Sequence, residues 1–507
     1  MWVTWQNPTC KSDSFITIEL LHSMFSQDDR GSVRCPSELT GRHERVMPSI
    51  PTPFSANCVP AIWERRGAAE PSAMKALATF TQAASFEERP SVLILHVTSS
   101  EADELTGQIS TAAQKIGGRP FGKYSASNGL GLPHNSNRLD GSQNITDLNS
   151  GFWYGVNVTL GTQELTLVLD TGSSDTWVFS NGTNCIGITG PDGKPIGDRM
   201  CTFGPRYQGD FPRGPWEHAY FSTDYWRNQT VNGTLGEMDV TVGGVHVTNQ
   251  TVGLADSATW WLGSGRSSGV LGLAYPGLTK AFFDLDGPGN LSFQATYSPV
   301  VSTMMGEGLT EGFFSLALNR PGSSETAGVI AFGGVPDDLE GIEWGRHART
   351  DIIIANVDGV DSSASEYSFY TIIADGWYFD GATDERRFEY IVDSDTPLNI
   401  LPFEVVDGIA EAFDPPAEYS DRFGFWVVDC DAIIPEVAVV INGTSFYLNA
   451  ADLVLDAAKG IHDPCFIAFN DGSPDGPYVL GSVFLKNVLA VFDVENAVME
   501  FAGREFY

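Results

Sequence analysis

Two short stretches of the sequence each carry an aspartate into a tight turn at the end of an apolar run. The first, TLVLDTGSSDTWVFS, turns at Asp170, and the second, YIVDSDTPLNILP, turns at Asp393. Two carboxyl groups held about 3 Å apart do not both ionise easily, so they share a proton. Such a pair is base and acid at once, because the ionised member takes a proton from water while the neutral member polarises a carbonyl group. This chemistry requires a fold that brings the two turns together.

The two turns lie in two parts of the chain whose sequences resemble each other. Each half has an apolar strand that ends at the aspartate and, later, an apolar strand that ends in Leu-Gly. These later strands are GVLGLAYPG at residues 269–277 and YVLGSVFLKN at residues 478–487. A repeat of this length suggests duplication, which would give two similar lobes with a cleft between them.

The pattern of apolar and turn residues from Gly151 onward predicts an all-β protein with few helices. Short alternating runs such as MDVTVGGVHVTNQTVGLA, GVIAFGG and AVVINGTSFYL are separated by Gly and Asn turns. A polar, Gly/Asn-rich linker occupies residues 125–143. We therefore expect an N-terminal extension with a linker at 1–150, a first β lobe at 151–335 and a second β lobe at 336–507.

Taken together, these segments resemble the pepsin-like aspartic proteases. LDTGSSDTWV resembles the first active-site motif of that family, and IVDSDTPLNILP resembles the second. VLGLAYP and VLGSVFLKNVLAVFD resemble the two apolar-Gly segments that pass beneath the catalytic loops, and the match covers roughly 151–507 in the expected order. The resemblance implies a bilobal all-β fold and an aspartic endopeptidase that cleaves polypeptides at acid pH. Asp170 and Asp393 would then be its catalytic residues, and no cofactor is needed.

The resemblance also assigns supporting roles within the two loops. Ser173 and Thr396 match the hydroxyl residues that hydrogen-bond the outer carboxylate oxygens, which stabilises the charged form and fixes its orientation. Thr171 and Ser394 match the pair that cross-links the two loops. Gly172 stands at the glycine of the first motif.

A further segment, YFSTDYWRNQTVNGTLGEMDVTVGG, resembles the flap hairpin of the family, a lid that closes on substrate and excludes water. Alignment through GTLGEMDVTVGG makes Tyr225 the flap tyrosine. Trp177 matches the tryptophan that usually partners that tyrosine.

One residue departs from the family pattern, because Asp395 replaces the glycine of the second loop. A glycine lets the backbone approach the carboxylates closely, whereas aspartate adds bulk and a third carboxyl group. If ionised about 6 Å from the pair, it would repel them by roughly 3 kcal/mol at an effective dielectric near 20. We expect Asp395 to limit catalysis. The alternative function is therefore a catalytically impaired pepsin-like protein that binds peptides or proteins in its cleft.

The charge of the chain is strongly negative and unevenly distributed. The net charge is −35, which excludes nucleic acid as a partner because phosphates would be repelled. Residues 1–150 hold 13 Lys+Arg against 15 Asp+Glu, a balance of −2, and residues 151–507 hold 16 against 49, a balance of −33. The less acidic segment therefore predicts a removable prosegment that shields the cleft until acid weakens the attraction.

Seven cysteines and the sequons point to an oxidising compartment. Cys185 and Cys201 bracket a loop after the first motif, and Cys430 and Cys465 follow the second, so two local disulfides are expected. An odd set has no predicted pairing: Cys10, Cys35 and Cys58. Eight asparagines begin Asn-X-Ser/Thr, which favours glycosylation: Asn144, Asn157, Asn181, Asn228, Asn232, Asn249, Asn290 and Asn442.

These features predict a secreted or vacuolar/lysosomal monomer. No apolar run of about 18 residues or more is present, so no membrane span is expected. A signal peptide is not evident at Met1, because the candidate SFITIELLHSMF is interrupted by Glu19 and His22. His462 lies near Cys465, but no second ligand pair accompanies it, so no metal site is expected.

Overall fold

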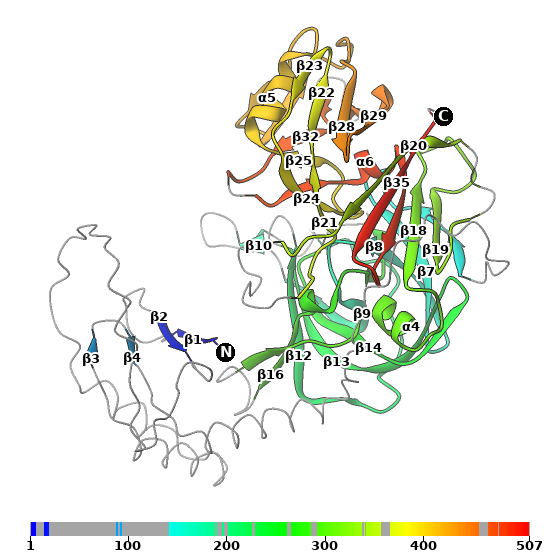
Figure 1. Ribbon diagram of the computed structural model, residues 1–507. Helices are drawn as coiled ribbons and strands as arrows, with labels where there is room; N and C mark the ends of the chain where they lie inside the picture. Colours follow the sequence, from blue (N-terminus) through cyan, green and yellow to red (C-terminus); the bar gives the residue numbers. More distant parts are fainter. Residues whose placement is uncertain are drawn as a thin grey trace, which may run out of the picture. The chain divides into compact units, whose positions relative to one another are not determined.

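The computed structural model (Figure 1) describes most of the chain from residue 141 to residue 505, together with four short strands nearer the N-terminus. The described part has gaps at 187, 190–194, 197–200, 226–228, 261–264, 285–291, 337–338, 340, 356–365, 456–464 and 475. The predictions for Cys10, Cys35, Cys58 and His462 lie outside the described residues.

The chain divides into two compact units, Met1–Gly117 and Gly118–Tyr507. In the first unit, two antiparallel pairs are described, β1 with β2 and β3 with β4. Their bounds are β1 Trp2–Gln6, β2 Phe15–Glu19, β3 Glu88–Arg89 and β4 Val92–Leu93.

A large sheet forms most of the first half of the second unit, with its described strands in the order β17-β16-β12-β13-β14-β9-β15-β8-β7-β6. The strands are β6 Thr146–Asp147, β7 Tyr154–Leu160, β8 Gln163–Asp170, β9 Thr176–Cys185, β12 Pro215–Tyr225, β13 Gln229–Val242, β14 Val245–Ala258, β15 Gly269–Gly272, β16 Ala281–Asp284 and β17 Ser292–Ala295. β13 also pairs with β7, so the sheet curls back on itself. Burial alternates along β13, as expected for a strand with one face in the core. The turn from β13 to β14 needs Gly243 and Gly244, whose φ angles are 59° and 75°.

Three smaller sheets form the second half. Their orders are β21-β24-β33-β25-β32, β23-β22-β28-β29 and β26-β27-β31-β30. The strands are β21 Thr371–Ala374, β22 Gly376–Phe379, β23 Ala382–Asp384, β24 Phe388–Val392, β25 Asn399–Leu401, β26 Glu418–Ser420, β27 Phe425–Val428, β28 Val437–Ile441, β29 Thr444–Leu448, β30 Val454–Leu455, β31 Cys465–Ile467, β32 Phe469–Asp471 and β33 Tyr478–Leu480.

A further sheet joins the two halves, because it takes strands from both in the order β20-β35-β34-β18-β19-β5. Its strands are β5 Ser142–Asn144, β18 Phe313–Leu318, β19 Gly328–Phe332, β20 Ile342–Asp351, β34 Val488–Asp493 and β35 Val498–Arg504. In Figure 1 the late strands β20 and β35 run beside the earlier β18 and β19. One continuous apolar core runs through both halves.

Helices in the described part are short and lie between strands. They are η3 Pro276–Leu278, α4 Val300–Gly306, α5 Phe403–Glu411, η4 Ala450–Asp452 and α6 Ser482–Leu485. A small hairpin pairs β10 Ile188–Thr189 with β11 Pro195–Ile196. Within the described residues, none of the helices has the length and apolar character needed to cross a membrane. The all-β prediction is therefore confirmed.

The same strand arrangement occurs in both halves, as the internal repeat predicts. In the first half, β15 runs parallel to β8 and antiparallel to β9. In the second half, β33 runs parallel to β24 and antiparallel to β25. Asp170 is the last residue of β8, and Asp393 directly follows β24, so the two aspartates occupy equivalent places in the two halves.

Both predicted disulfides are present. Cys185 pairs with Cys201 at a Cα separation of 5.9 Å, and Cys430 pairs with Cys465 at 5.1 Å. These separations lie within the range that a disulfide can span. Each bond closes a local loop that follows one of the two aspartate turns.

Candidate active site

The repeated strand arrangement fixes the main chain at both aspartates. Asp170 ends β8 and lies opposite Gly272 of β15, and its carbonyl oxygen accepts from the Leu273 N–H at 2.8 Å. Asp393 follows β24, and its N–H donates to the Leu480 carbonyl oxygen at 3.1 Å. Buried backbone groups must find partners. These bonds therefore hold each aspartate against the Leu-Gly strand of its own half.

Four hydrogen bonds cross from one loop to the other. The Ser394 hydroxyl accepts from the Thr171 N–H at 3.1 Å and donates to the Leu169 carbonyl oxygen at 2.7 Å. The Thr171 hydroxyl accepts from the Ser394 N–H at 2.9 Å and donates to the Val392 carbonyl oxygen at 2.9 Å. Both hydroxyl residues are fully buried. The structure thus brings together the two loops, which lie more than two hundred residues apart in the chain.

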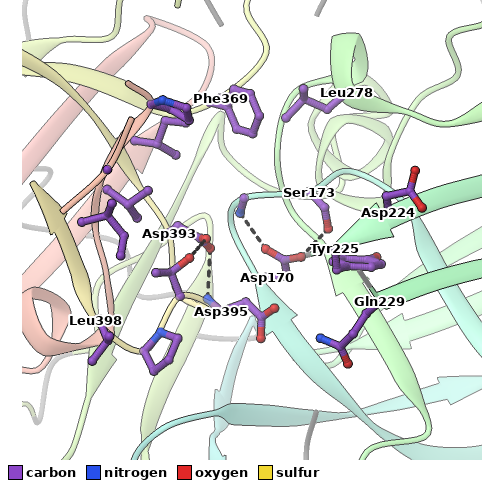
Figure 2. Close-up of a pocket in the computed structure, with 18 of the residues that line it drawn as sticks. Asp170, Ser173, Asp224, Tyr225, Gln229, Leu278, Phe369, Asp393, Asp395 and Leu398 are labelled. Carbon is purple, nitrogen blue, oxygen red and sulfur yellow. Dashed lines mark hydrogen bonds between the residues drawn. The ribbon is translucent and has the colours of Figure 1, made fainter. Parts of the chain in front are cut away.

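Each carboxyl group is oriented by donors from its own loop. Asp170 accepts from the Gly172 N–H at 2.7 Å and from the Ser173 hydroxyl. Asp393 accepts in the same way from the N–H of the residue two positions on, at 3.0 Å, and from the Thr396 hydroxyl at 2.5 Å. Each of the two carboxyl groups lies close enough to affect the pKa of the other. Figure 2 shows them facing one another across the pocket.

Burial and mutual repulsion favour the protonated form of this pair. Burial, and then the neighbouring carboxylate, raise the pKa of Asp170, and the bonds from Ser173 and Gly172 oppose the shift. Burial also raises the pKa of Asp393 against the bonds from its own loop. Because each group affects the other, the two titrate as a unit. The arrangement retains a proton at acid pH, as the chemistry of a shared-proton pair requires.

Gly172 is the point of closest approach between the loops. A Cβ atom added there would lie 2.7 Å from Cγ of Asp393 and 2.9 Å or less from both its carboxylate oxygens. Such contacts are too short for any side chain, so the first loop requires glycine at this position.

The corresponding position in the second loop holds Asp395 without disturbing the backbone. Its N–H donates to Asp393 as the Gly172 N–H does to Asp170, and its φ angle is not positive. Its side chain lines the pocket, and Figure 2 shows it on the same side as Gln229. Burial, followed by the charges of Asp170 and Asp393, raises the pKa of Asp395 well above the usual carboxyl range.

The predicted flap pair also comes together. Tyr225 is the last residue of β12, and β12 pairs with β13 as a long antiparallel hairpin. The Trp177 indole N–H donates to the Tyr225 hydroxyl at 2.7 Å. The hairpin turn at 226–228 lies outside the described residues.

Two groups near the site were missed by the sequence analysis. Trp260 is fully buried and packs edge-on against Trp177 and Tyr225, with ring centroids 5.0 and 5.3 Å away. The Trp-Trp doublet that follows β14 was its only signal in the sequence.

The second missed group is Asp175, which lies five residues after Asp170 and is 2% exposed. Its carboxylate accepts from the Tyr297 hydroxyl at 2.7 Å and from the Lys280 N–H at 3.1 Å. Burial raises the pKa of Asp175 to about 6, although these donors oppose the shift. Its only signal in the sequence was an acidic residue directly before the apolar run TWVF.

These groups surround a single cavity of about 710 Å³. Both aspartates of the pair line it, together with Tyr225, Lys280 and a wall of apolar side chains from the second half. A cavity of this size accommodates several side chains of a bound peptide. Among the described residues, no group of three His, Cys, Asp or Glu side chains is arranged to hold a metal ion.

Comparison with known proteins agrees with this geometry. Residues 153–504 match the family model described as eukaryotic aspartyl protease. A probable aspartic-type endopeptidase of Aspergillus fumigatus is 35% identical over 378 residues, which cover 73% of this chain and 82% of that protein. Penicillopepsin-1 of Penicillium roqueforti is 26% identical over 69% of this chain and 78% of its own.

Among solved structures, an aspartic proteinase from Irpex lacteus has the same fold, with a TM-score of 0.54 at 18% identity. The match covers 72% of this chain and 98% of that one. The family match takes in both loops, the hairpin of β12 and β13, and every strand of the joining sheet except β5. The chain is therefore a member of the eukaryotic aspartyl protease family, with the bilobal all-β fold of its pepsin-like branch.

Proposed function

We propose that this chain is an endopeptidase that hydrolyses peptide bonds in proteins at acid pH, with Asp170 and Asp393 as its catalytic residues. The observation that carries the proposal is that hydrogen bonds between the two loops bring the carboxyl groups of Asp170 and Asp393 into one cavity. The names of its relatives, an aspartic-type endopeptidase and a penicillopepsin, support the same activity.

The reaction needs no covalent intermediate. The ionised carboxylate takes a proton from water, and the water oxygen bonds to the carbonyl carbon of the peptide. The neutral carboxyl group gives its proton to the carbonyl oxygen, which yields a tetrahedral diol. The first carboxyl group, now protonated, then passes its proton to the amide nitrogen. The C–N bond then breaks, and one hydroxyl of the diol returns its proton to the second carboxylate, so that a carboxylic acid, an amine and the original shared-proton pair are formed.

The surrounding residues would hold the two carboxyl groups in the positions that the reaction needs. Thr171 and Ser394 hold the loops together, while Ser173 and Thr396 fix the outer carboxylate oxygens. Trp177 fixes the position of the Tyr225 hydroxyl at the end of the flap strand. The flap hairpin would close over the substrate and exclude water, with Tyr225 facing the cavity.

A second candidate function is peptide binding without efficient cleavage, which Asp395 favours. It places a third carboxyl group beside the pair, in a position where the first loop has glycine. Its raised pKa reduces the electrostatic penalty at acid pH, because the group is then neutral. We therefore favour the active enzyme.

Cleavage of a denatured protein at about pH 3–5, with and without pepstatin, separates the two functions. We expect cleavage that pepstatin abolishes and that Asp170→Asn removes, because one carboxylate alone cannot supply both proton transfers. Tight binding of pepstatin without any cleavage would instead establish the binding protein.

We also propose export to an oxidising compartment, as a monomeric, glycosylated precursor whose N-terminal extension is removed. The two disulfides support such a compartment. Two sequon asparagines are half-buried with bonded side chains, Asn157 and Asn232. Three others are exposed and open to glycosylation, Asn144, Asn181 and Asn249, whereas the exposed Asn442 donates its side-chain N–H to the Arg349 carbonyl oxygen at 3.0 Å.

A further inference from the structure

The cavity is strongly acidic beyond what hydrolysis requires. Its described lining contains six aspartates and one lysine, Lys280. Where these carboxyl groups ionise, low-dielectric walls concentrate their charge, so a cationic group is attracted and an anionic one is repelled. The question is which aspartate lacks a partner and would gain most from a cation.

Hydrogen bonds satisfy the two aspartates of the pair, as described above. Asp175 accepts from Tyr297 and from the Lys280 main chain. Asp471 accepts from the Trp426 indole N–H at 3.1 Å. Asp224 is exposed, so water solvates its carboxylate.

Asp395 differs from all of these. Its Oδ1 atom is shielded from solvent and has no hydrogen-bond partner among the described residues. A second oxygen in the same lining, Oδ1 of Asn470, is also buried and without a partner there. Two unsatisfied acceptors cost free energy unless donors reach them. A ligand in the cavity that carries an N–H group and a positive charge would offer Asp395 both a donor and a complementary charge.

We infer that Asp395 is a specificity-determining residue that selects substrates with a lysine or arginine side chain next to the scissile bond. Its N–H donates to the Asp393 carboxylate and its side chain lines the same cavity, so Asp395 lies next to the pair that we propose to cut the peptide. A cation there also favours the ionised form of Asp395 and offsets its repulsion of the pair. The same residue therefore impairs cleavage of neutral sequences and favours cleavage of basic ones. This inference rests on the proposed endopeptidase function.

The test uses two peptides that differ only in arginine or citrulline next to the scissile bond. Citrulline keeps the shape of arginine but has no charge. At about pH 5, we expect kcat/KM for the arginine peptide to exceed that for the citrulline peptide by about tenfold or more. A hydrogen bond to a charged group supplies a ratio of that size. Asp395→Asn should reduce the ratio to near one, because asparagine keeps the shape and removes the charge.

Glu411→Gln provides the matched control, since it makes the same change of charge at an exposed position of α5 outside the cavity. The ratio should survive in this variant. A ratio near one in the natural chain, or an unchanged ratio in Asp395→Asn, would overturn the inference.

A binding measurement keeps the inference separate from the proposed function. The same pair of peptides, with the scissile amide replaced by a hydroxyethylene group, cannot be cleaved, and titration calorimetry gives their Kd values. If the chain binds the arginine form selectively through Asp395 but cleaves neither peptide, the specificity stands and the endopeptidase function fails. If it cleaves both peptides equally and binds both equally, the function stands and the specificity fails.

Discussion

At the scale of single residues, the second loop shows that a family position can change while its backbone role survives. Asp395 keeps the N–H donation to Asp393 that Gly172 makes to Asp170, and it does so at a φ angle open to any residue. What changes is the chemistry of the cavity, because a third carboxyl group now lies beside the pair. We therefore expect the effect of Asp395 to be electrostatic.

Replacing Asp395 with glycine tests this point. For a peptide without basic residues at acid pH, Asp395→Gly should raise kcat/KM by about five- to tenfold, or roughly 1 kcal/mol, which is less than the roughly 3 kcal/mol for a fully ionised Asp395 because the group is then mostly neutral. The gain should increase towards the less acid range in which Asp395 ionises, since its pKa is raised well above the usual range. A measured pH profile of both proteins checks this. Lower activity of a folded Asp395→Gly protein on the neutral peptide would contradict it.

At the scale of elements, Asp175 connects the turn after β8 to the segment between η3 and α4. Its partners are the main chain of Lys280 and the hydroxyl of Tyr297, which is 122 positions further along the chain. The carboxylate is 2% exposed, and burial raises its pKa from 3.8 to about 6. The folded protein therefore binds a proton there more tightly than the unfolded chain does.

Stability should follow from this difference. A group whose folded pKa is raised contributes stability below its unfolded pKa, and that contribution is lost as pH rises through about 6. A shift of about two units corresponds to roughly 3 kcal/mol. In an Asp170→Asn background, which prevents self-digestion, Asp175→Asn should flatten the fall in free energy of unfolding between about pH 4 and 6 by that amount.

Chemical denaturation at a series of pH values measures this effect. Near pH 4 the asparagine variant should be destabilised by about 1 kcal/mol, because its amide N–H₂ meets the Lys280 N–H donor. The Asp170→Asn protein without the second change is the control. Parallel pH dependences for the two proteins would show that Asp175 does not titrate in this range.

At the scale of the whole molecule, the net charge differs strongly between the N-terminal 150 residues and the rest of the chain. Residues 151–507 carry a balance of −33, against −2 for residues 1–150. At neutral pH the Lys and Arg side chains of residues 1–150, nearly half of those in the chain, would pair with carboxylates of the acidic part, and protonation of those carboxylates would weaken the pairs. This asymmetry supports a prosegment that leaves in acid.

Acidification of the purified full-length protein tests the prosegment. Between about pH 7 and pH 3, intact-mass measurement should show loss of the N-terminal segment as activity appears. The same mass spectra of protein secreted from a fungal host would reveal glycans at the exposed sequons. A protein that stays full-length and is equally active at both pH values would rule out the prosegment.

The sequence by itself determined the features that depend on short stretches of chain. An apolar run followed by Asp-Thr-Gly or Asp-Ser-Asp predicted a strand and a turn, and the later Leu-Gly runs predicted the partner strands of each half. Cysteines 16 and 35 positions apart predicted both disulfides. Periodicity and turn residues are properties of short segments, so they can be recognised from the sequence before the fold is known.

Only the tertiary structure decided what depends on contacts between distant segments. The edge-on packing of Trp260 on the flap pair, the burial of Asp175 against Tyr297 and the unsatisfied oxygen of Asp395 have no local pattern. Burial and pairing determine the pKa and the hydrogen-bonding state of a carboxyl group, and both arise only when remote strands pack together. The sequence identifies three aspartates in two loops, whereas the fold decides which two are held by donors of their own loops and which one has an oxygen without a partner among the described residues.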